Sequence, residues 1–174
     1  MNKVLFALMA CFSLSTGYAE EGKMENVEKP AFYIVGIECK TSNDPAVGPQ
    51  QIGQLWSRFF IENVAGRVLN KVSDDVFALY CEYEGDYTKP YTFVIGCQVS
   101  SVDQIPEGMV FKVLPSAKYT VYSVEGEYPQ SLVKTWGEIW QSDLKRTYSG
   151  DFEVYGEKFF TTDSKPVDVY IAIE

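Results

Sequence analysis

The pattern of apolar and polar positions predicts two amphipathic helices set among short strands. Apolar residues recur at helical spacing between residues 50 and 64 and again between residues 128 and 145, so each segment presents one apolar stripe. The second segment carries Trp136 and Trp140 one turn apart, and Pro129 falls in its first turn, where a helix tolerates proline. We therefore expect both helices to pack against a core.

The other apolar runs are typical of strands. They are short, rich in β-branched and aromatic residues, and bounded by glycine, proline or serine. They span residues 32–38, 77–83, 91–99, 109–114, 118–125, 152–160 and 167–173. Residues 20–30 are polar and charged without such a pattern, and we expect them to form a flexible tether.

The order of these elements repeats along the chain. A strand, a helix and two strands are followed by the same order in the second half. Aligning Trp56 with Trp136 superposes the two helical stripes, and aligning Phe77 with Phe152 superposes the strands that follow. The repeat predicts one α+β domain of two strand–helix–strand–strand units related by a pseudo-twofold axis. Their strands would form an antiparallel sheet with both helices on one face, and a cleft would lie between the units.

One position breaks the repeat, because the second copy has Glu153 where the first has Ala78. Alternate residues of a strand face opposite sides. Phe152 and Val154 therefore share one face, and Glu153 and Tyr155 share the other. If Phe152 and Val154 face a helix-packed core, Glu153 points to the opposite face. A carboxylate among aromatic rings suits an organic cation, since each good cation–π contact contributes about 0.5–2 kcal/mol. The alternative is an ordinary solvated glutamate.

Four aromatic residues are candidates for the walls of such a site. They are Tyr80, Tyr155, Trp136 and Trp140. The tryptophans also fit simple core packing, because large rings dominate protein cores, and buried tyrosine hydroxyls need polar partners. We predict that these four residues bind a ligand together with Glu153.

The composition limits the kinds of catalysis and the partners that we expect for this protein. The 174 residues include no histidine and carry a formal net charge of −9. The lack of histidine excludes Ser–His and Cys–His catalysis and removes the commonest metal ligand, so we expect neither a cofactor nor a metal. An acidic chain without a basic cluster argues against nucleic acid as a partner. Whether any two of Cys39, Cys81 and Cys97 pair is left open.

The first 19 residues have the pattern of a secretory signal peptide. Lys3 gives a positive start, residues 4–14 are largely apolar, and small residues at positions 17 and 19 suit a signal peptidase. We therefore expect a periplasmic or secreted protein without a transmembrane segment in its mature chain. The alternative is a lipoprotein anchored at Cys11.

Several short motifs, taken in order, carry a family resemblance. They are Phe77-Ala78-Leu79-Tyr80, Tyr91 to Gly96, Ile105 to Met109, Trp136 with Trp140, Phe152-Glu153-Val154-Tyr155, and Val169-Tyr170-Ile171. Together they resemble the GyrI-like effector-binding family over residues 31–174. That family includes the ligand-binding domains attached to AraC-type and MerR-type transcription regulators, and also stand-alone proteins.

The resemblance implies a ligand pocket between the two halves. In family members that bind lipophilic cations, a glutamate of the penultimate strand lies at the pocket floor, and only Glu153 matches that position. Some stand-alone members are hydrolases that use a glutamate and a tyrosine, roles that Glu153 and Tyr155 would fill. The chain departs from the regulators, because no helix-turn-helix is expected ahead of Phe32 and export argues against transcription.

Three functions follow from these observations. The first is the binding of a small hydrophobic or cationic organic molecule by a stand-alone exported domain. The second is a hydrolase that works without histidine, and the third is a protein-interaction or inhibitor module acting through its acidic surface. The oligomeric state is left open.

Overall fold

The structure is a computed structural model that describes residues 24–174. The predicted signal peptide and the alternative anchor at Cys11 lie outside the described residues. Eight strands form one antiparallel sheet in the order β1-β6-β8-β7-β3-β4-β2-β5. The strands are β1 (Met24–Lys29), β2 (Phe32–Thr41), β3 (Val76–Cys81), β4 (Tyr91–Val99), β5 (Val110–Leu114), β6 (Ala117–Val124), β7 (Asp151–Tyr155) and β8 (Val167–Ile173). The helices are α1 (Gly48–Ile61), α2 (Val64–Arg67), α3 (Gln130–Gln141) and α4 (Glu157–Thr161).

The duplicated α+β architecture is confirmed by the order of strands in the sheet. The first unit, β2-α1-β3-β4, contributes the neighbours β2-β4-β3, and the second unit, β6-α3-β7-β8, contributes β6-β8-β7. The units join where β3 pairs with β7, and there Ala78 lies directly opposite Glu153. Phe77 pairs with Val154, and Leu79 pairs with Phe152. This register places the pseudo-twofold axis between Ala78 and Glu153, the two positions that the repeat aligns.

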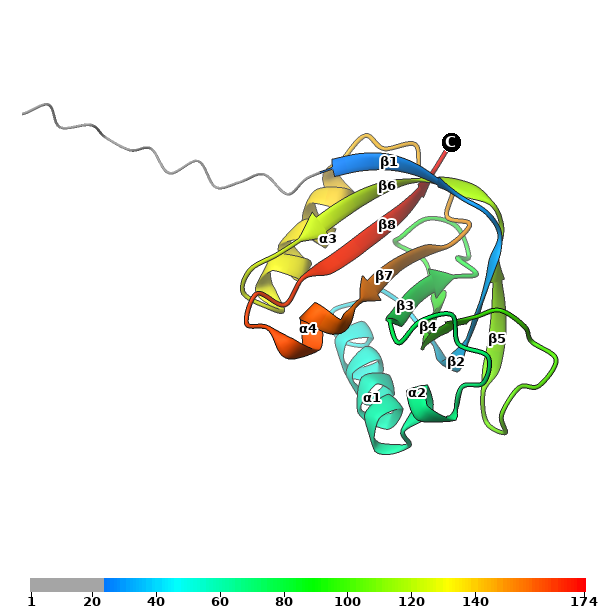
Figure 1. The fold of residues 1–174 in the computed structure, drawn as a ribbon. Coiled ribbons are helices and arrows are strands. Elements are labelled where there is room, and N and C mark those ends of the chain that lie inside the picture. The colour runs from blue at the N-terminus through cyan, green and yellow to red at the C-terminus, as the bar shows by residue number, and fades with distance from the viewer. Residues whose placement is uncertain (1–23) are drawn as a thin grey trace, which may run out of the picture.

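Helices cover only one face of the sheet (Figure 1). Leu55 and Phe59 of α1 and Trp136 and Ile139 of α3 pack with that face in one core. The opposite face has a core of its own, built from strand residues such as Phe152. Only residues 30 and 31 separate β1 from β2, although these strands lie toward opposite ends of the sheet. The sheet must therefore curl until its ends approach each other.

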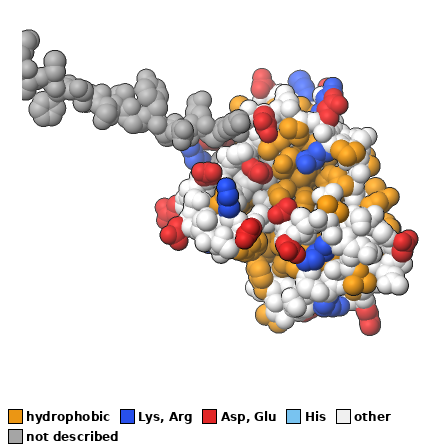
Figure 2. Space-filling view, in the orientation of Figure 1, with side chains coloured by type: hydrophobic (Ala, Val, Ile, Leu, Met, Phe, Trp, Pro, Cys, Tyr) orange, Lys and Arg blue, Asp and Glu red, His pale blue; other side chains and the backbone are white. Residues whose placement is uncertain are grey.

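The predicted alternation along β7 is confirmed, but the helices cover the face opposite to Phe152 and Val154. Phe152 and Val154 face the helix-free core, where Phe152 stacks on Tyr170 with ring centroids 4.5 Å apart. Glu153 and Tyr155 face the helices. Because the curled sheet buries both of its faces, apolar residues at positions 152 and 154 do not identify the helix-covered side. Figure 2 shows apolar side chains gathered inside the arch of β1, with charged side chains around them.

Two further segments differ from the sequence expectations. Residues 24–29 form β1 rather than a tether. This edge strand is held by backbone pairing with β6 and leaves most side chains exposed, so no apolar alternation marks it. The strand predicted over 152–160 ends at Tyr155, and α4 begins after Gly156, which takes the extended N-cap conformation.

Two glycines face each other where β2 and β4 approach closely. Gly36 pairs with Gly96. A Cβ atom on Gly36 would lie 2.0 Å from the Ile95 carbonyl oxygen, and one on Gly96 would lie 2.2 Å from the Val35 carbonyl oxygen. Neither position has room for a side chain.

The cysteines of residues 24–174 are not joined in a disulfide. Cys39, Cys81 and Cys97 are all free thiols. Within the same range, every helix is too short or too polar to cross a membrane.

Candidate ligand-binding site

The structure brings Glu153 together with three of the four predicted aromatic residues. Glu153 is only 2% exposed. Its Oε1 accepts hydrogen bonds from the Tyr80 hydroxyl at 2.9 Å and from Trp136 Nε1 at 2.6 Å, and its Oε2 accepts one from the Tyr155 hydroxyl at 2.6 Å. These donors come from β3, α3 and β7, so both units contribute to holding one carboxylate.

The position of the carboxylate follows from the pseudo-twofold symmetry. Tyr80 and Tyr155 occupy equivalent strand positions in the two units, and each donates to a different oxygen of Glu153. The opposite residue, Ala78, is fully buried and adds no polar group. The carboxylate therefore lies on the axis, with one tyrosine from each side.

No cationic side chain in residues 24–174 forms an ion pair with Glu153. Burial raises the pKa of its carboxyl group, while the hydrogen bonds from Tyr155, Trp136 and Tyr80 oppose that rise. Burial, reinforced by the nearby carboxylate, also raises the pKa of both tyrosines well above the ordinary value. An ionised carboxylate in this place is costly without a cation, because desolvation of a charge costs several kcal/mol.

A cavity of about 360 Å³ adjoins this group. Residues of α1 and α3 line it on either side, and five aromatic residues contribute to its wall: Tyr80, Tyr83, Tyr91, Trp136 and Trp140. Glu153 does not line the cavity, since the rings of Tyr80 and Trp136 lie in front of it. A larger hollow outside α1, of about 700 Å³, is open to solvent and lacks a buried charge, so we do not regard it as the site.

The tyrosine hydroxyls and the Asn43 amide of the cavity wall are already paired within the protein. The Tyr91 hydroxyl donates to Asn43 Oδ1 at 2.9 Å, and Asn43 Nδ2 donates to the Tyr87 carbonyl at 2.8 Å. The Tyr83 hydroxyl donates to Asp151 at 3.0 Å. Trp140, the fourth predicted aromatic residue, does not contact Glu153 but stacks on Tyr87 with the ring planes 6° apart. The wall therefore offers ring faces rather than free tyrosine hydroxyls.

The sequence analysis missed several residues of this site. Tyr83 and Tyr91 flank the β3–β4 hairpin, and their rings reach the cavity only because the hairpin folds back beside α3. Asp151 was also missed; it is fully buried and lies 2.6 Å from Arg146 Nη2. The signal available for Tyr83 was its place in the repeat, because aligning Lys89-Pro90 with the later Lys-Pro pair matches it with Phe159.

The fold and the carboxylate enclosed by aromatic rings define an effector-binding domain. The model of the Cass2 family, described as integron-associated effector binding protein, matches residues 26–173, and the chain belongs to this family. The earlier resemblance to the GyrI-like effector-binding fold is confirmed.

Solved structures agree with this assignment. An integron cassette protein of Vibrio cholerae superposes with a TM-score of 0.67 at 30% identity, covering 88% of this chain and 97% of that one. The SAV2435 protein, solved with tetraphenylphosphonium bound, superposes with a TM-score of 0.71 at 17% identity, covering 87% and 94%. At that lower identity the likeness shows the fold alone.

Two relatives are named as transcriptional regulators. YobU of Bacillus subtilis is 28% identical over 146 residues, covering 81% of this chain and 91% of the relative. BrlR of Pseudomonas aeruginosa is 33% identical over 156 residues, covering 84% of this chain. The match spans only 54% of the length of BrlR.

Proposed function

We propose that the protein binds lipophilic organic cations in the cavity between α1 and α3. The observation that carries this proposal is the buried Glu153 carboxylate, which has three neutral donors but no cationic partner in the described residues. A bound cation would supply the missing charge. The volume of about 360 Å³ lies within the range of small-molecule sites.

The ring faces explain how such a cation is held. Tyr80 and Trp136 lie between the cavity and the carboxylate, with centroids 4.9 Å apart. A cation against these rings gains about 0.5–2 kcal/mol per contact, and the carboxylate behind them adds attraction across a poorly hydrated gap. A ligand without N–H groups suits this wall best, because its tyrosine hydroxyls and the Asn43 amide are already paired. The tetraphenylphosphonium bound to SAV2435, which shares the fold, supports this ligand class.

The geometry gives less support to the hydrolase alternative. A general base must come within hydrogen-bonding distance of its substrate, directly or through one water. Glu153 is shielded from the cavity, and its oxygens already accept hydrogen bonds from Tyr80, Trp136 and Tyr155. Binding without chemical conversion therefore fits the site better.

A fluorescence titration with tetraphenylphosphonium tests the proposal. We expect saturable quenching by the cation and at least about tenfold weaker binding by Glu153→Gln, equivalent to about 1.4 kcal/mol. The uncharged analogue triphenylphosphine oxide should bind both proteins alike. Equal affinity of the folded Glu153→Gln variant and the wild type for the cation would contradict the assignment.

We also propose that the domain works outside the cytoplasm, on the strength of the N-terminal sequence pattern. Mass spectrometry of the mature N-terminus after expression of the full chain tests this. Cleavage after Ala19 supports secretion, a lipid on Cys11 supports anchoring, and an intact N-terminus contradicts export.

A further inference from the structure

The pseudo-twofold axis relates the aromatic wall of the cavity to a second aromatic group beyond the carboxylate. Matched strand by strand and helix by helix, the corresponding pairs are Tyr80 and Tyr155, Trp136 and Trp56, and Trp140 and Phe60. Phe159 of α4 corresponds to Tyr83. We call Tyr155, Trp56, Phe60 and Phe159 the Trp56 cluster.

The Trp56 cluster repeats the ring spacings of the cavity wall. The Tyr155 and Trp56 centroids lie 5.1 Å apart, against 4.9 Å for Tyr80 and Trp136. Trp56 and Phe60 lie 5.8 Å apart, against 6.1 Å for their counterparts in α3. Tyr155 also contacts Phe159, at 4.8 Å.

Both aromatic groups donate a hydrogen bond to the Glu153 carboxylate. Tyr155 of the Trp56 cluster donates to Oε2 of Glu153, whereas Tyr80 of the cavity wall donates to Oε1. The outer part of the Trp56 cluster is open to solvent, since Phe60 is 58% exposed and the adjacent Phe160 is 45% exposed. A ligand therefore has access to this group from outside.

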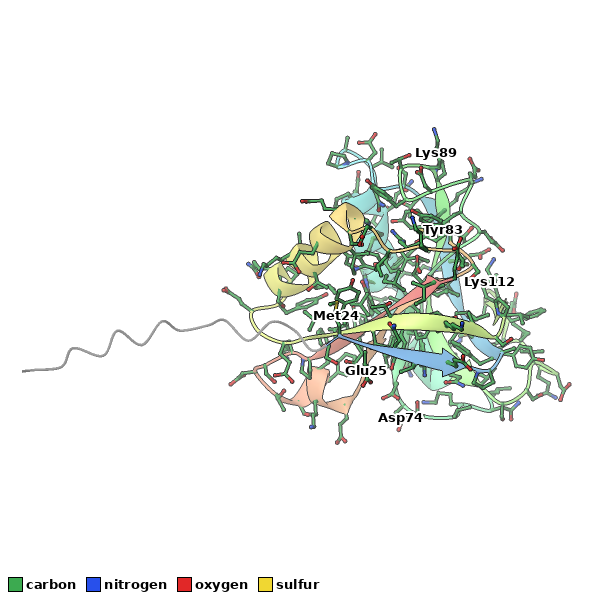
Figure 3. All side chains as sticks on the ribbon, turned by 90° about the horizontal axis from the view of Figure 1, so that it is seen from above. Met24, Glu25, Asp74, Tyr83, Lys89 and Lys112 are labelled. Atoms are coloured by element: carbon green, nitrogen blue, oxygen red, sulfur yellow. The ribbon has the colours of Figure 1, made fainter. Side chains whose placement is uncertain are left out.

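A lysine of the chain already lies on the Trp56 cluster. The Lys165 ammonium nitrogen is 5.6 Å from the centroid of the Phe159 ring and donates to the Phe159 carbonyl at 3.0 Å. Lys165 has a left-handed backbone, with φ of 44°. Its counterpart in the first unit, Lys89, is exposed at the rim of the molecule (Figure 3). One half thus carries its own cation over a ring, whereas the other half has a cavity beside its rings.

We propose that the Trp56 cluster is a second site for lipophilic aromatic cations, that it shares Glu153 with the cavity, and that Lys165 is its internal competitor. This inference rests on the proposed function of the cavity. One carboxylate balances one positive charge, so a cation on either side weakens binding on the other. The second site is the weaker one, because a ligand must displace the Lys165 ammonium from the ring.

The three tryptophans of the chain allow both sites to be observed at once. The full mature chain is labelled with 5-fluorotryptophan, and its three ¹⁹F signals are assigned with single Trp→Phe variants. Tetraphenylphosphonium is then titrated. We expect the Trp136 and Trp140 signals to shift first and the Trp56 signal to shift in a second, weaker step. A Trp56 signal that stays fixed to saturation, in wild type and in Lys165→Met, overturns the second site.

Matched lysine variants test the internal competitor. Lys165→Met should tighten the second step about 2- to 5-fold, the effect of one cation–π contact at an exposed ring. Lys165→Arg, which keeps the charge, should resemble wild type, and so should Lys89→Met. If Lys89→Met and Lys165→Met increased the affinity of the second step equally, the cause would be a general charge effect, and the role of Lys165 as competitor would be overturned. Movement of Trp136 and Trp140 alone leaves the cavity proposal standing, whereas no movement of any signal overturns both.

Discussion

Two buried carboxylates lie two residues apart on β7 and differ in what compensates their charge. Asp151 is paired with Arg146 at 2.6 Å and also accepts a hydrogen bond from the Ala172 amide at 2.8 Å. Glu153 has only uncharged donors, from Tyr80, Trp136 and Tyr155. Asp151 therefore acts within the fold, by fixing Tyr83 and the β8 backbone, while Glu153 lacks a counter-ion in the described residues, as the proposed binding of a cation requires.

Removing one partner of the Arg146–Asp151 pair should destabilise the fold strongly. We expect Arg146→Met to lower the free energy of unfolding by about 3–5 kcal/mol, because it leaves Asp151 buried without its counter-ion. Denaturant unfolding measures this. The control is Lys134→Met, which removes an exposed ion pair with Glu138 and should change stability by less than about 1 kcal/mol. Comparable stability of Arg146→Met and wild type would show that the ion pair has no structural role.

The affinity for a permanently charged ligand should depend on pH through Glu153. Burial raises the pKa of this carboxyl group, so on acidification it takes up a proton at higher pH than an exposed glutamate does. The protonated form has no charge to offer a cation. Tetraphenylphosphonium affinity should be greatest above the folded-state pKa and fall by up to about tenfold per pH unit below it.

The stability of the ligand-free protein should change in the opposite sense. The stabilisation from protonated Glu153 is fully present below the unfolded-state pKa and is lost as pH rises through the folded-state pKa.

Dissociation constants measured across the acidic range, with Glu153→Gln as the control whose affinity should not depend on pH, test the binding profile. An affinity that stays constant until exposed glutamates titrate would contradict it.

At the scale of elements, the close approach of β2 and β4 depends on glycine. Gly36→Ala would place a methyl group 2.0 Å from the Ile95 carbonyl oxygen, so we expect a loss of at least about 2 kcal/mol in the free energy of unfolding. The matched control is Gly53→Ala in α1, where no atom lies within 4 Å of the new methyl. That change should stabilise the helix by about 0.5–1 kcal/mol. Thermal or denaturant unfolding of both variants measures these changes. An unchanged free energy of unfolding for Gly36→Ala would show that β2 and β4 can move apart at little cost.

Elements with a strong side-chain pattern were predictable from the sequence, and elements held by the backbone were not. The strand over residues 167–173 was predicted to the residue, because β-branched and aromatic residues fill it. β1 escaped prediction since pairing with β6 depends on amide and carbonyl groups that every residue carries. α4 escaped because Phe159 and Phe160 fit a strand as well as a helical turn.

The same distinction applies to the candidate site. Glu153 was found because it interrupts a repeat, which is a property of the sequence itself. Which face of the sheet the helices cover could not be predicted at Glu153, since both faces of the curled sheet are buried. The pairing of Asp151 with Arg146 and the inward position of Tyr83 depend on strand register and a hairpin bend. No local pattern encodes either of them.

At the scale of the whole molecule, the join between the units is a strand pair rather than a linker. β3 and β7 pair through five residues each, so the sheet runs without a break from β1 to β5. Two units joined in this way are expected to fold as one body and to hold the axis rigidly. The formal net charge of −9 adds a long-range attraction for cations, which raises their concentration near the surface.

The pairing of Ala78 with Glu153 has an evolutionary consequence. A homodimer of a single unit would place the same side chain on both sides of its axis. Two glutamates there would face each other at about 5 Å and repel, and two alanines would provide no charge. Two copies encoded separately within the chain can each carry a different residue at this position, as Ala78 and Glu153 do. The lone acid at the centre is an asymmetry that a symmetric ancestor had no means to encode.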